Sequence, residues 1–152
     1  MKDRFLIFTT LLLSVIGIGA SNAMAQSVTG TGVFGPGNGG PPTTVTVSAQ
    51  QGGNGGVLRF GAGQTEIVAH PIDVCVDGNT AFVVAEITQA SGDFTGAEGA
   101  FLQFGFQDNG KDGDFILVPF IFFVSPVQIP ACDLAPLSFP FPLDRGSYQV
   151  KP

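Results

Sequence analysis

The segment TEIVAHPIDVCVDGNTAFVVAEITQ, residues 65–89, decides the fold of this chain. Two apolar runs flank the tetrapeptide DGNT, in which Gly78 and Asn79 tolerate the positive φ angles of a two-residue hairpin loop. A loop at these positions pairs Asp77 with Thr80 and thereby fixes the pairs beyond them. One face of the predicted hairpin then carries seven apolar residues and one histidine: Val76, Ala81, Val74, Val83, Ile72, Ala85, His70 and Ile87.

The other face of this hairpin is mixed in polarity, and its predicted pairs are Cys75–Phe82, Asp73–Val84 and Pro71–Glu86. Side chains alternate between the two faces of a strand, so a slip of one residue would mix the apolar face with the polar one. The hydrophobic pattern therefore specifies the register of the hairpin.

The rest of the chain has no helical period, and Gly, Pro, Asn and Asp interrupt its apolar segments about every eight to twelve residues. This spacing predicts an all-β fold, an antiparallel sandwich or small barrel of about 7–9 strands. Besides the hairpin, strands are expected at 27–34, 43–50, 57–61, 99–108 and 147–152. The expected apolar faces are Val45, Val47 and Ala49; Leu58 and Phe60; and Leu102, Phe104 and Phe106, opposite Gln103 and Gln107.

The C-terminal part of the chain is rich in Phe and Pro. Residues 115–126 are apolar at nearly every position, but Pro119 excludes an unbroken central strand. We expect two short strands with a bend, or one strand with a bulge. Residues 130–146 contain four prolines and are expected to be irregular.

Residues 1–25 have the pattern of a signal peptide: a short charged start, an apolar run and small residues. Cleavage is expected after Ala25, with Ala23 as the alternative. The apolar run of about 16 residues is shorter than the roughly 20 that span a bilayer. We therefore expect a secreted or periplasmic protein without a membrane span after cleavage, with an N-terminal strand and Gly/Pro-rich connector at 26–42 and a single β domain at 43–152.

The charge of the chain after residue 25 is strongly negative, because four strong bases stand against eleven acids, a net charge of −7. Such a surface repels phosphate backbones and anionic membranes. The charge argues against nucleic-acid binding; the partner stays unknown, with a protein and a small apolar ligand as the open alternatives.

Two cysteines, Cys75 and Cys132, follow the predicted cleavage site. An even number of cysteines in an exported chain predicts a disulfide. A closed loop of nearly 60 residues would stabilise the fold by roughly 4 kcal/mol. The alternative is a pair of buried free thiols.

The segment DNGKDGD raises the question of a calcium site, with Asp108, Asp112 and Asp114 as weak candidate ligands. An EF-hand loop needs an oxygen ligand at its third position and a glutamate at its twelfth. Gly110 and Pro119 occupy those positions. All features of the segment also suit a hairpin loop, in which aspartates cap backbone N–H groups, so we favour a turn and expect no cofactor.

Catalytic residues are not evident. His70 is the single histidine and has no nucleophile at a motif spacing. The spacing of Glu66, Glu86 and Glu98 does not single out a glycosidase pair. With no tryptophan and one tyrosine, a sugar-stacking surface would depend on phenylalanine alone. We do not expect an enzyme.

The order of motifs resembles a large group of uncharacterised secreted bacterial β-rich proteins. The group's motifs are a Cys-x-x-x-Gly-Asn-Thr-Ala hairpin, which this chain matches at 75–81 with one residue fewer between Cys75 and Gly78, an Asp-Asn-Gly loop followed by Asp-Phe, and a late cysteine. The resemblance covers about 50–150 and departs from the group in the tract 115–142. It implies a β-rich fold and no particular activity.

The leading hypothesis is a secreted, non-enzymatic β domain with a structural or binding role at the cell exterior. A second hypothesis is a small barrel that carries an apolar ligand in a Phe-rich interior. A third is a fibre or pilus subunit that exchanges a strand, for which residues 27–34 are the candidate. Their apolar residues, Val28, Val33 and Phe34, do not share one face in a regular strand.

Overall fold

The computed structural model describes residues 25–35, 40–53, 55–119 and 138–152. In these ranges the chain forms one antiparallel sheet and two short 3-10 turns, η1 (Gly92–Phe94) and η2 (Gly110–Asp112). The strands are β1 (Ser27–Phe34), β2 (Thr43–Gln50), β3 (Gly56–Ala62), β4 (Thr65–Asp77), β5 (Thr80–Ala90), β6 (Phe101–Gln107), β7 (Phe115–Pro119), β8 (Ser138–Pro142) and β9 (Arg145–Lys151). The predicted all-β class is confirmed.

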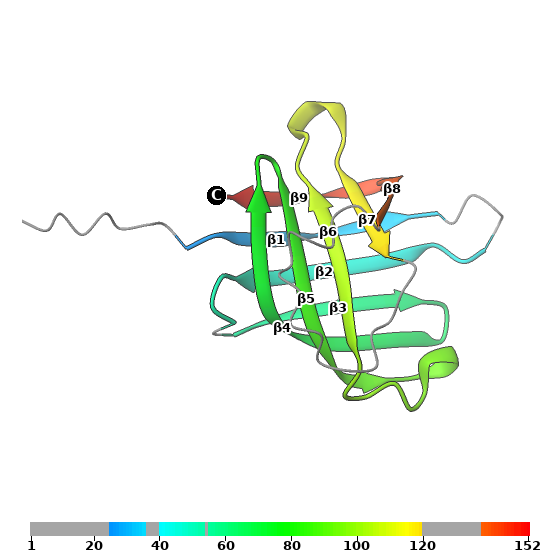
Figure 1. Ribbon diagram of the computed structural model, residues 1–152. Helices are drawn as coiled ribbons and strands as arrows, with labels where there is room; N and C mark the ends of the chain where they lie inside the picture. The colour runs from blue at the N-terminus through cyan, green and yellow to red at the C-terminus, as the bar shows by residue number, and fades with distance from the viewer. Residues whose placement is uncertain (1–24, 36–39, 54, 120–137) are drawn as a thin grey trace, which may run out of the picture.

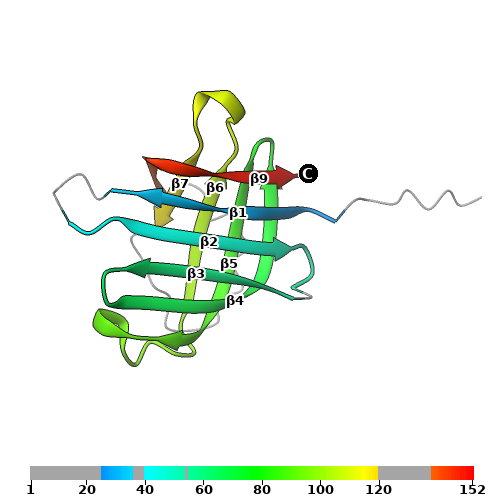
Figure 2. The same cartoon turned by 180° about the vertical axis from the view of Figure 1, so that it is seen from behind.

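The sheet runs in the order β8-β7-β6-β5-β4-β3-β2-β1-β9 and curls strongly into a half-barrel (Figure 1 and Figure 2). Strands β8 and β9 follow each other in the chain, yet they form its two edges. The two residues that link them make hydrogen bonds near both edges of the sheet. Leu143 N donates to Asp114 O, just before β7, at 3.1 Å, and Asp144 N donates to Val33 O on β1 at 2.8 Å. A single curled sheet agrees with the barrel expectation and not with a sandwich.

The β4–β5 hairpin confirms the predicted register next to its turn. Pairs run from Asp77–Thr80 to Asp73–Val84, and Gly78 has the positive φ of 59° that the loop requires. Cys75 therefore pairs with Phe82, on the face opposite Val74 and Val83, as expected from the alternation.

Farther from the turn, the predicted pairs of Ile72 with Ala85, Pro71 with Glu86 and His70 with Ile87 are wrong. The register shifts between Pro71 and Asp73, so Pro71 pairs with Ala85 and His70 pairs with Glu86. Pro71 has no N–H for the ladder, and such positions favour a bulge. The bulge turns Ile72 outward, where it is 42% exposed, and places His70 on the exposed face.

A second register shift, between Val68 and Ala69, restores the original pairing at Val68–Gln89. It leaves Thr88 without a partner in the ladder, and its hydroxyl donates to Val68 O at 3.1 Å. Bulges bend strands and increase their twist. These two bulges lie on opposite strands of the longest hairpin.

The core fills the inner face of the curl with the predicted alternating residues. Val45, Val47 and Ala49 are at most 2% exposed. The other strands supply the remaining members of the cluster: Val28, Phe34, Leu58, Ile67, Ala69, Val74, Ala81, Val83, Ala85, Ile87, Leu102, Phe104, Phe106, Ile116 and Tyr148. Within the described ranges, the structure contains no helix with the length and hydropathy of a membrane span.

The outer face of β5 and β6 is also buried, which the alternation did not predict. Phe82 and Val84 are each 6% exposed, and Gln103 is 1% exposed. These residues alternate with the inner residues Val83 and Phe104, so both faces of the sheet are covered here.

One expectation for the Pro-rich C-terminal tract is wrong. Residues 138–142, expected to be irregular, form β8, which pairs with β7 from Phe115–Pro142 to Pro119–Ser138. Pro140 and Pro142 are tolerated because β8 is an edge strand. The bend or bulge expected after Pro119 falls in residues 120–137, which lie outside the described residues.

Strand β1 lies inside the sheet, between β2 and β9. Its inward positions include Gly30 and Gly32, which leave room for the ring of Tyr148 on β9. A Cβ atom at Gly32 would lie 2.6 Å from the Tyr148 hydroxyl and 2.7 Å from Leu143 Cδ1. An aromatic residue that covers glycines on a neighbouring strand stabilises an otherwise poorly packed pair.

Candidate functional site

The loop between β6 and β7 holds the first candidate site, and its most buried group is Asp114, which is 6% exposed. Asp114 Oδ1 accepts a hydrogen bond from Asn109 N at 2.9 Å, inside the loop. Asp114 Oδ2 accepts one from Tyr148 N at 2.6 Å, across the molecule on β9. A carboxylate that accepts two backbone N–H groups makes charge-assisted hydrogen bonds, which are the stronger kind.

Asp108 makes a similar pair of hydrogen bonds, one inside the loop and one to β9. Its Oδ1 accepts from Gly110 N at 3.1 Å and its Oδ2 accepts from Val150 N at 3.4 Å. Tyr148 and Val150 are alternate residues of β9, so their N–H groups point to the same side of that strand. We call the contacts of Asp108 and Asp114 with these two N–H groups the carboxylate clasp. The clasp binds the free edge of β9 to the β6–β7 loop.

A second set of hydrogen bonds joins the clasp loop to the β4–β5 turn. Asn79 Nδ2 donates to Asp108 O and to Asn109 Oδ1, both at 2.9 Å. Asp108 N donates to Asn79 O at 2.9 Å. Asn79 was expected only to shape its own turn, and the structure shows that it also fixes the neighbouring loop.

The predicted calcium ligands are not gathered around a common point. The carboxylates of Asp108 and Asp114 are directed to backbone N–H groups, and Asp112 is exposed. Across the ranges that the structure describes, no group of three His, Cys, Asp or Glu side chains is arranged for a metal ion. The loop joins two adjacent antiparallel strands, which is the turn geometry that the sequence favours.

Calcium is therefore expected to leave the melting temperature unchanged. A bound ion would stabilise the fold by roughly 2.7 kcal/mol at a hundredfold excess over its dissociation constant. Thermal scans with calcium and with a chelator measure this difference directly. An upward shift that Asp112→Ala abolishes would identify a calcium site and contradict the turn.

Tyr148 is the most perturbed titratable group of the site. Burial raises the pKa of its hydroxyl well above the ordinary value, and the negative charge of Asp114 raises this pKa further. A hydrogen bond with the backbone of Gly32 acts in the opposite direction. The hydroxyl also donates to Val45 O at 3.3 Å, so the structure holds Tyr148 in its neutral form.

The raised pKa of Tyr148 predicts a loss of stability in alkali. Above the unfolded-state pKa of about 10 the folded protein keeps a proton that the unfolded chain releases, so stability falls as pH rises. The slope reaches at most about 1.4 kcal/mol per pH unit for this one group. Urea unfolding between about pH 9 and pH 11 measures the slope, and Tyr148→Phe should reduce it by this contribution. An unchanged slope in that variant would contradict the assignment.

The remaining predicted residues do not gather into one site. His70 and Glu86 form an exposed cross-strand pair, and Glu98 Oε1 accepts from Ala90 N at 3.1 Å. Cys75 is half-buried on β4 and is not a free cysteine. Cys132 lies outside the described residues, so the disulfide between the two stays a prediction.

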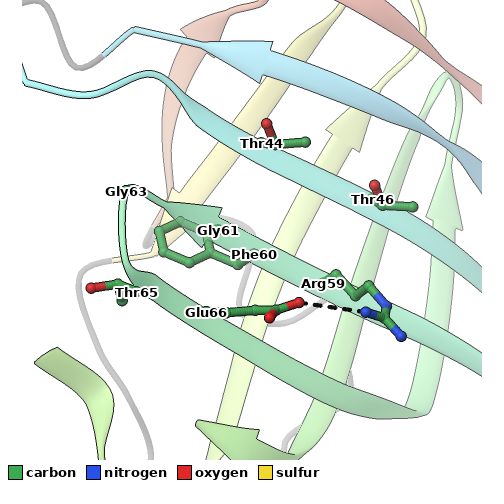
Figure 3. Close-up of a pocket in the computed structure, with 8 residues that line it drawn as sticks. All are labelled: Thr44, Thr46, Arg59, Phe60, Gly61, Gly63, Thr65 and Glu66. Atoms are coloured by element: carbon green, nitrogen blue, oxygen red, sulfur yellow. Dashed lines mark hydrogen bonds and ion pairs between the residues drawn. The ribbon is translucent and has the colours of Figure 1, made fainter. Parts of the chain in front are cut away.

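A second candidate site is a shallow hollow of about 280 Å³ on the outer face of β2, β3 and β4 (Figure 3). Arg59 Nη1 and Glu66 Oε1 form an ion pair across it at 3.4 Å, and their side chains are 57% and 56% exposed. The other lining residues are mostly hydroxylated or small: Thr44, Thr46, Phe60, Gly61, Gly63 and Thr65. We call this hollow the threonine groove.

A smaller hollow shares Glu66 with the threonine groove and is otherwise lined by Val68, Gln89, Ala90 and Ser91. Ser91 Oγ accepts from Glu66 N at 3.1 Å, which fixes the backbone at the junction. The β3–β4 turn brings Arg59 and Glu66 together, because Ala62 pairs with Thr65 and Gly61 pairs with Glu66. This site was not predicted from the sequence; Gly63, which suits a two-residue loop with Gln64, is the signal that could have indicated it.

Comparison with known proteins adds no relative: no family model, curated protein or solved structure matches the chain. The class is therefore defined by the fold alone, as an all-β half-barrel of antiparallel strands. What the two candidate sites can do is therefore inferred from their geometry alone.

Proposed function

We propose that this protein is a secreted, non-enzymatic β domain that binds a partner at the cell exterior through the threonine groove. The observation that carries the proposal is a solvent-open hollow lined mostly by polar residues, on a sheet whose described interior is packed with side chains. A rigid sheet that presents hydrogen-bonding groups outward suits recognition of a polar segment of another protein.

The packed interior favours this function over an apolar carrier. Ring contacts link Phe60 to Phe104 at 5.8 Å, Phe104 to Phe106 at 6.3 Å and Phe106 to Tyr148 at 4.8 Å between centroids. These rings lie where a barrel carrier would need space for its ligand. These four aromatic side chains thus fill the described interior with one another instead of leaving space for a ligand.

The position of β1 favours a self-contained domain over strand exchange. Eight residues of β1 pair with β2, and seven of them pair with β9 of the same chain. A donated strand would leave a gap between β2 and β9 in its own sheet. Val28 and Phe34 also pack in the core, so β1 has a buried face within its own sheet.

The threonine groove supplies the chemistry of the proposed contact. Thr44, Thr46 and Thr65 offer hydroxyls that donate and accept, and Arg59 and Glu66 offer a planar donor and an acceptor. An exposed ion pair contributes little to stability. Its groups can therefore exchange partners at low cost when another polar surface arrives.

Native mass spectrometry of protein collected from the culture medium or periplasm tests the class of function. We expect the mass of a bare monomer. A co-purified lipid would support the carrier, and a ladder of oligomers would support strand exchange, and either result would overturn the proposal.

Photo-crosslinking in the secreting culture tests the binding surface. A photoreactive residue at Thr46, in the groove, is expected to give a discrete protein adduct. The matched position is Thr29, which is exposed on β1 outside the groove. Equal labelling from both positions, or none from Thr46, would contradict binding through the groove.

A further inference from the structure

Gln26 makes two hydrogen bonds just before β1. Its backbone O accepts from Gln51 N at 2.7 Å. Its side-chain Oε1 accepts from Val76 N at 3.0 Å. Val76 belongs to the part of β4 that extends beyond β3, because β3 pairs with β4 only from Thr65 to Ala69. The Gln26 side-chain carbonyl thus satisfies a strand N–H that β3 does not reach.

From this contact and the sequence before it, we propose that Gln26 is the first residue of the mature protein and that it is cyclised to pyroglutamate. The proposal rests on the predicted cleavage after Ala25 and is independent of what the threonine groove binds. Cleavage there would convert the backbone N of Gln26 into a free amine four bonds from the side-chain amide carbon, which is the spacing that closes a five-membered ring.

The reaction is an intramolecular transfer of the side-chain acyl group. The α-amino nitrogen attacks Cδ, a new N–Cδ bond forms, and the Cδ–Nε2 bond breaks. Nε2 leaves as ammonia and takes up a proton from the attacking amine, so the step needs no oxidant, reductant or second substrate. The product is a five-membered lactam that retains Oε1 as its carbonyl oxygen.

The contact with Val76 N uses the oxygen atom that the reaction keeps. Ring closure draws Cδ toward the Gln26 nitrogen, so the lactam carbonyl must reach Val76 N from a position nearer the backbone. Oε1 accepts the bond from Val76 N, whereas Nε2, the atom that leaves, makes no hydrogen bond to the described residues. A lactam carbonyl is as good an acceptor as a primary amide. Cyclisation would also remove a positive charge beside β1 and block aminopeptidases, which require a free amine.

Peptide mass spectrometry of the secreted protein tests the proposal. The N-terminal peptide is expected to begin at Gln26 and to be lighter than its sequence by one ammonia. The matched variant is Gln26→Glu, which keeps an acceptor oxygen for Val76 N but cyclises far more slowly and should retain a free amine. An N-terminal peptide that begins at Met24, or one that begins at Gln26 with an intact amide, would overturn the proposal.

Hydrogen exchange at Val76 separates the role of the contact from the modification. The Val76 amide should be protected in the cyclised protein and in Gln26→Glu, and it should exchange faster in Gln26→Ala. Equal protection in all three would mean that Oε1 does not hold this N–H, and the structural part of the argument would fail.

Discussion

Asp114→Ala is expected to lower the free energy of unfolding by about 3 kcal/mol or more. The substitution removes two charge-assisted hydrogen bonds, each of which contributes roughly 1.5–3 kcal/mol. It also leaves the N–H of the buried residue Tyr148 without its acceptor, and an unsatisfied buried donor costs about 1–3 kcal/mol, part of the same loss. Urea denaturation of the purified domain, followed by circular dichroism, measures the change.

The matched control is Asp112→Ala, in the same loop. Asp112 is exposed, and surface substitutions of this kind usually change stability by less than about 0.5 kcal/mol. Asp114→Asn keeps an acceptor oxygen without the charge and should fall between the two. If Asp114→Ala were no more destabilising than Asp112→Ala, the carboxylate clasp would not hold β9.

Tyr148→Ala is expected to cost about 3–5 kcal/mol, the range for removing a large aromatic side chain from a core. The ring is 1% exposed and packs edge-on against Phe106 at 4.8 Å. The neighbouring positions Gly30 and Gly32 carry no side chains that could move into the cavity. The loss should therefore lie toward the upper part of the range, measured again by urea denaturation.

Tyr148→Phe is the control for the ring itself. It removes only the hydroxyl, whose donor bond to Val45 O is 3.3 Å long, and a single hydrogen bond of this kind contributes about 1 kcal/mol. A similar loss in both variants would show that the hydroxyl, and not the packing of the ring over the glycines, is the main contribution.

The strands and their local register were predictable because they follow from alternation and turn chemistry. Each of these signals lies within a few residues, as in the pairs around Gly78 and the buried row Val45, Val47 and Ala49. The prediction went wrong at Pro71, where one missing N–H produced a bulge. A prediction from alternation assumes that every residue of a strand has a partner, so it does not detect the unpaired residue of a bulge.

The position of β8 and the clasp could not be predicted, for a different reason. Alternation says which face a residue occupies but not which strands become neighbours. Asp114 meets a backbone group 34 residues later, and Asp108 meets one 42 residues later. The aspartates were correctly interpreted as capping residues, but the N–H groups that they cap on β9 could be identified only once the sheet had curled.

The burial of Gln103 was missed on similar grounds. Its alternation with Leu102 and Phe104 placed it on the face opposite the apolar one, and the pattern gave no indication that this face is buried. Only the three-dimensional arrangement shows that this face is covered at β5 and β6. A glutamine in a strand carries no sequence signal for such a second layer.

The place of β9 has a consequence for how the chain matures. Val28 on the first strand pairs with Val150 on the ninth, so the sheet cannot be completed until nearly all strands have been synthesised. Pairings of such long sequence separation form slowly. Until β9 has been synthesised, β1 can pair only with β2, and its other edge stays open. The seven residues of β9 therefore cover the last open edge of β1. A chain interrupted before them would leave that edge exposed to proteases and to pairing with other chains.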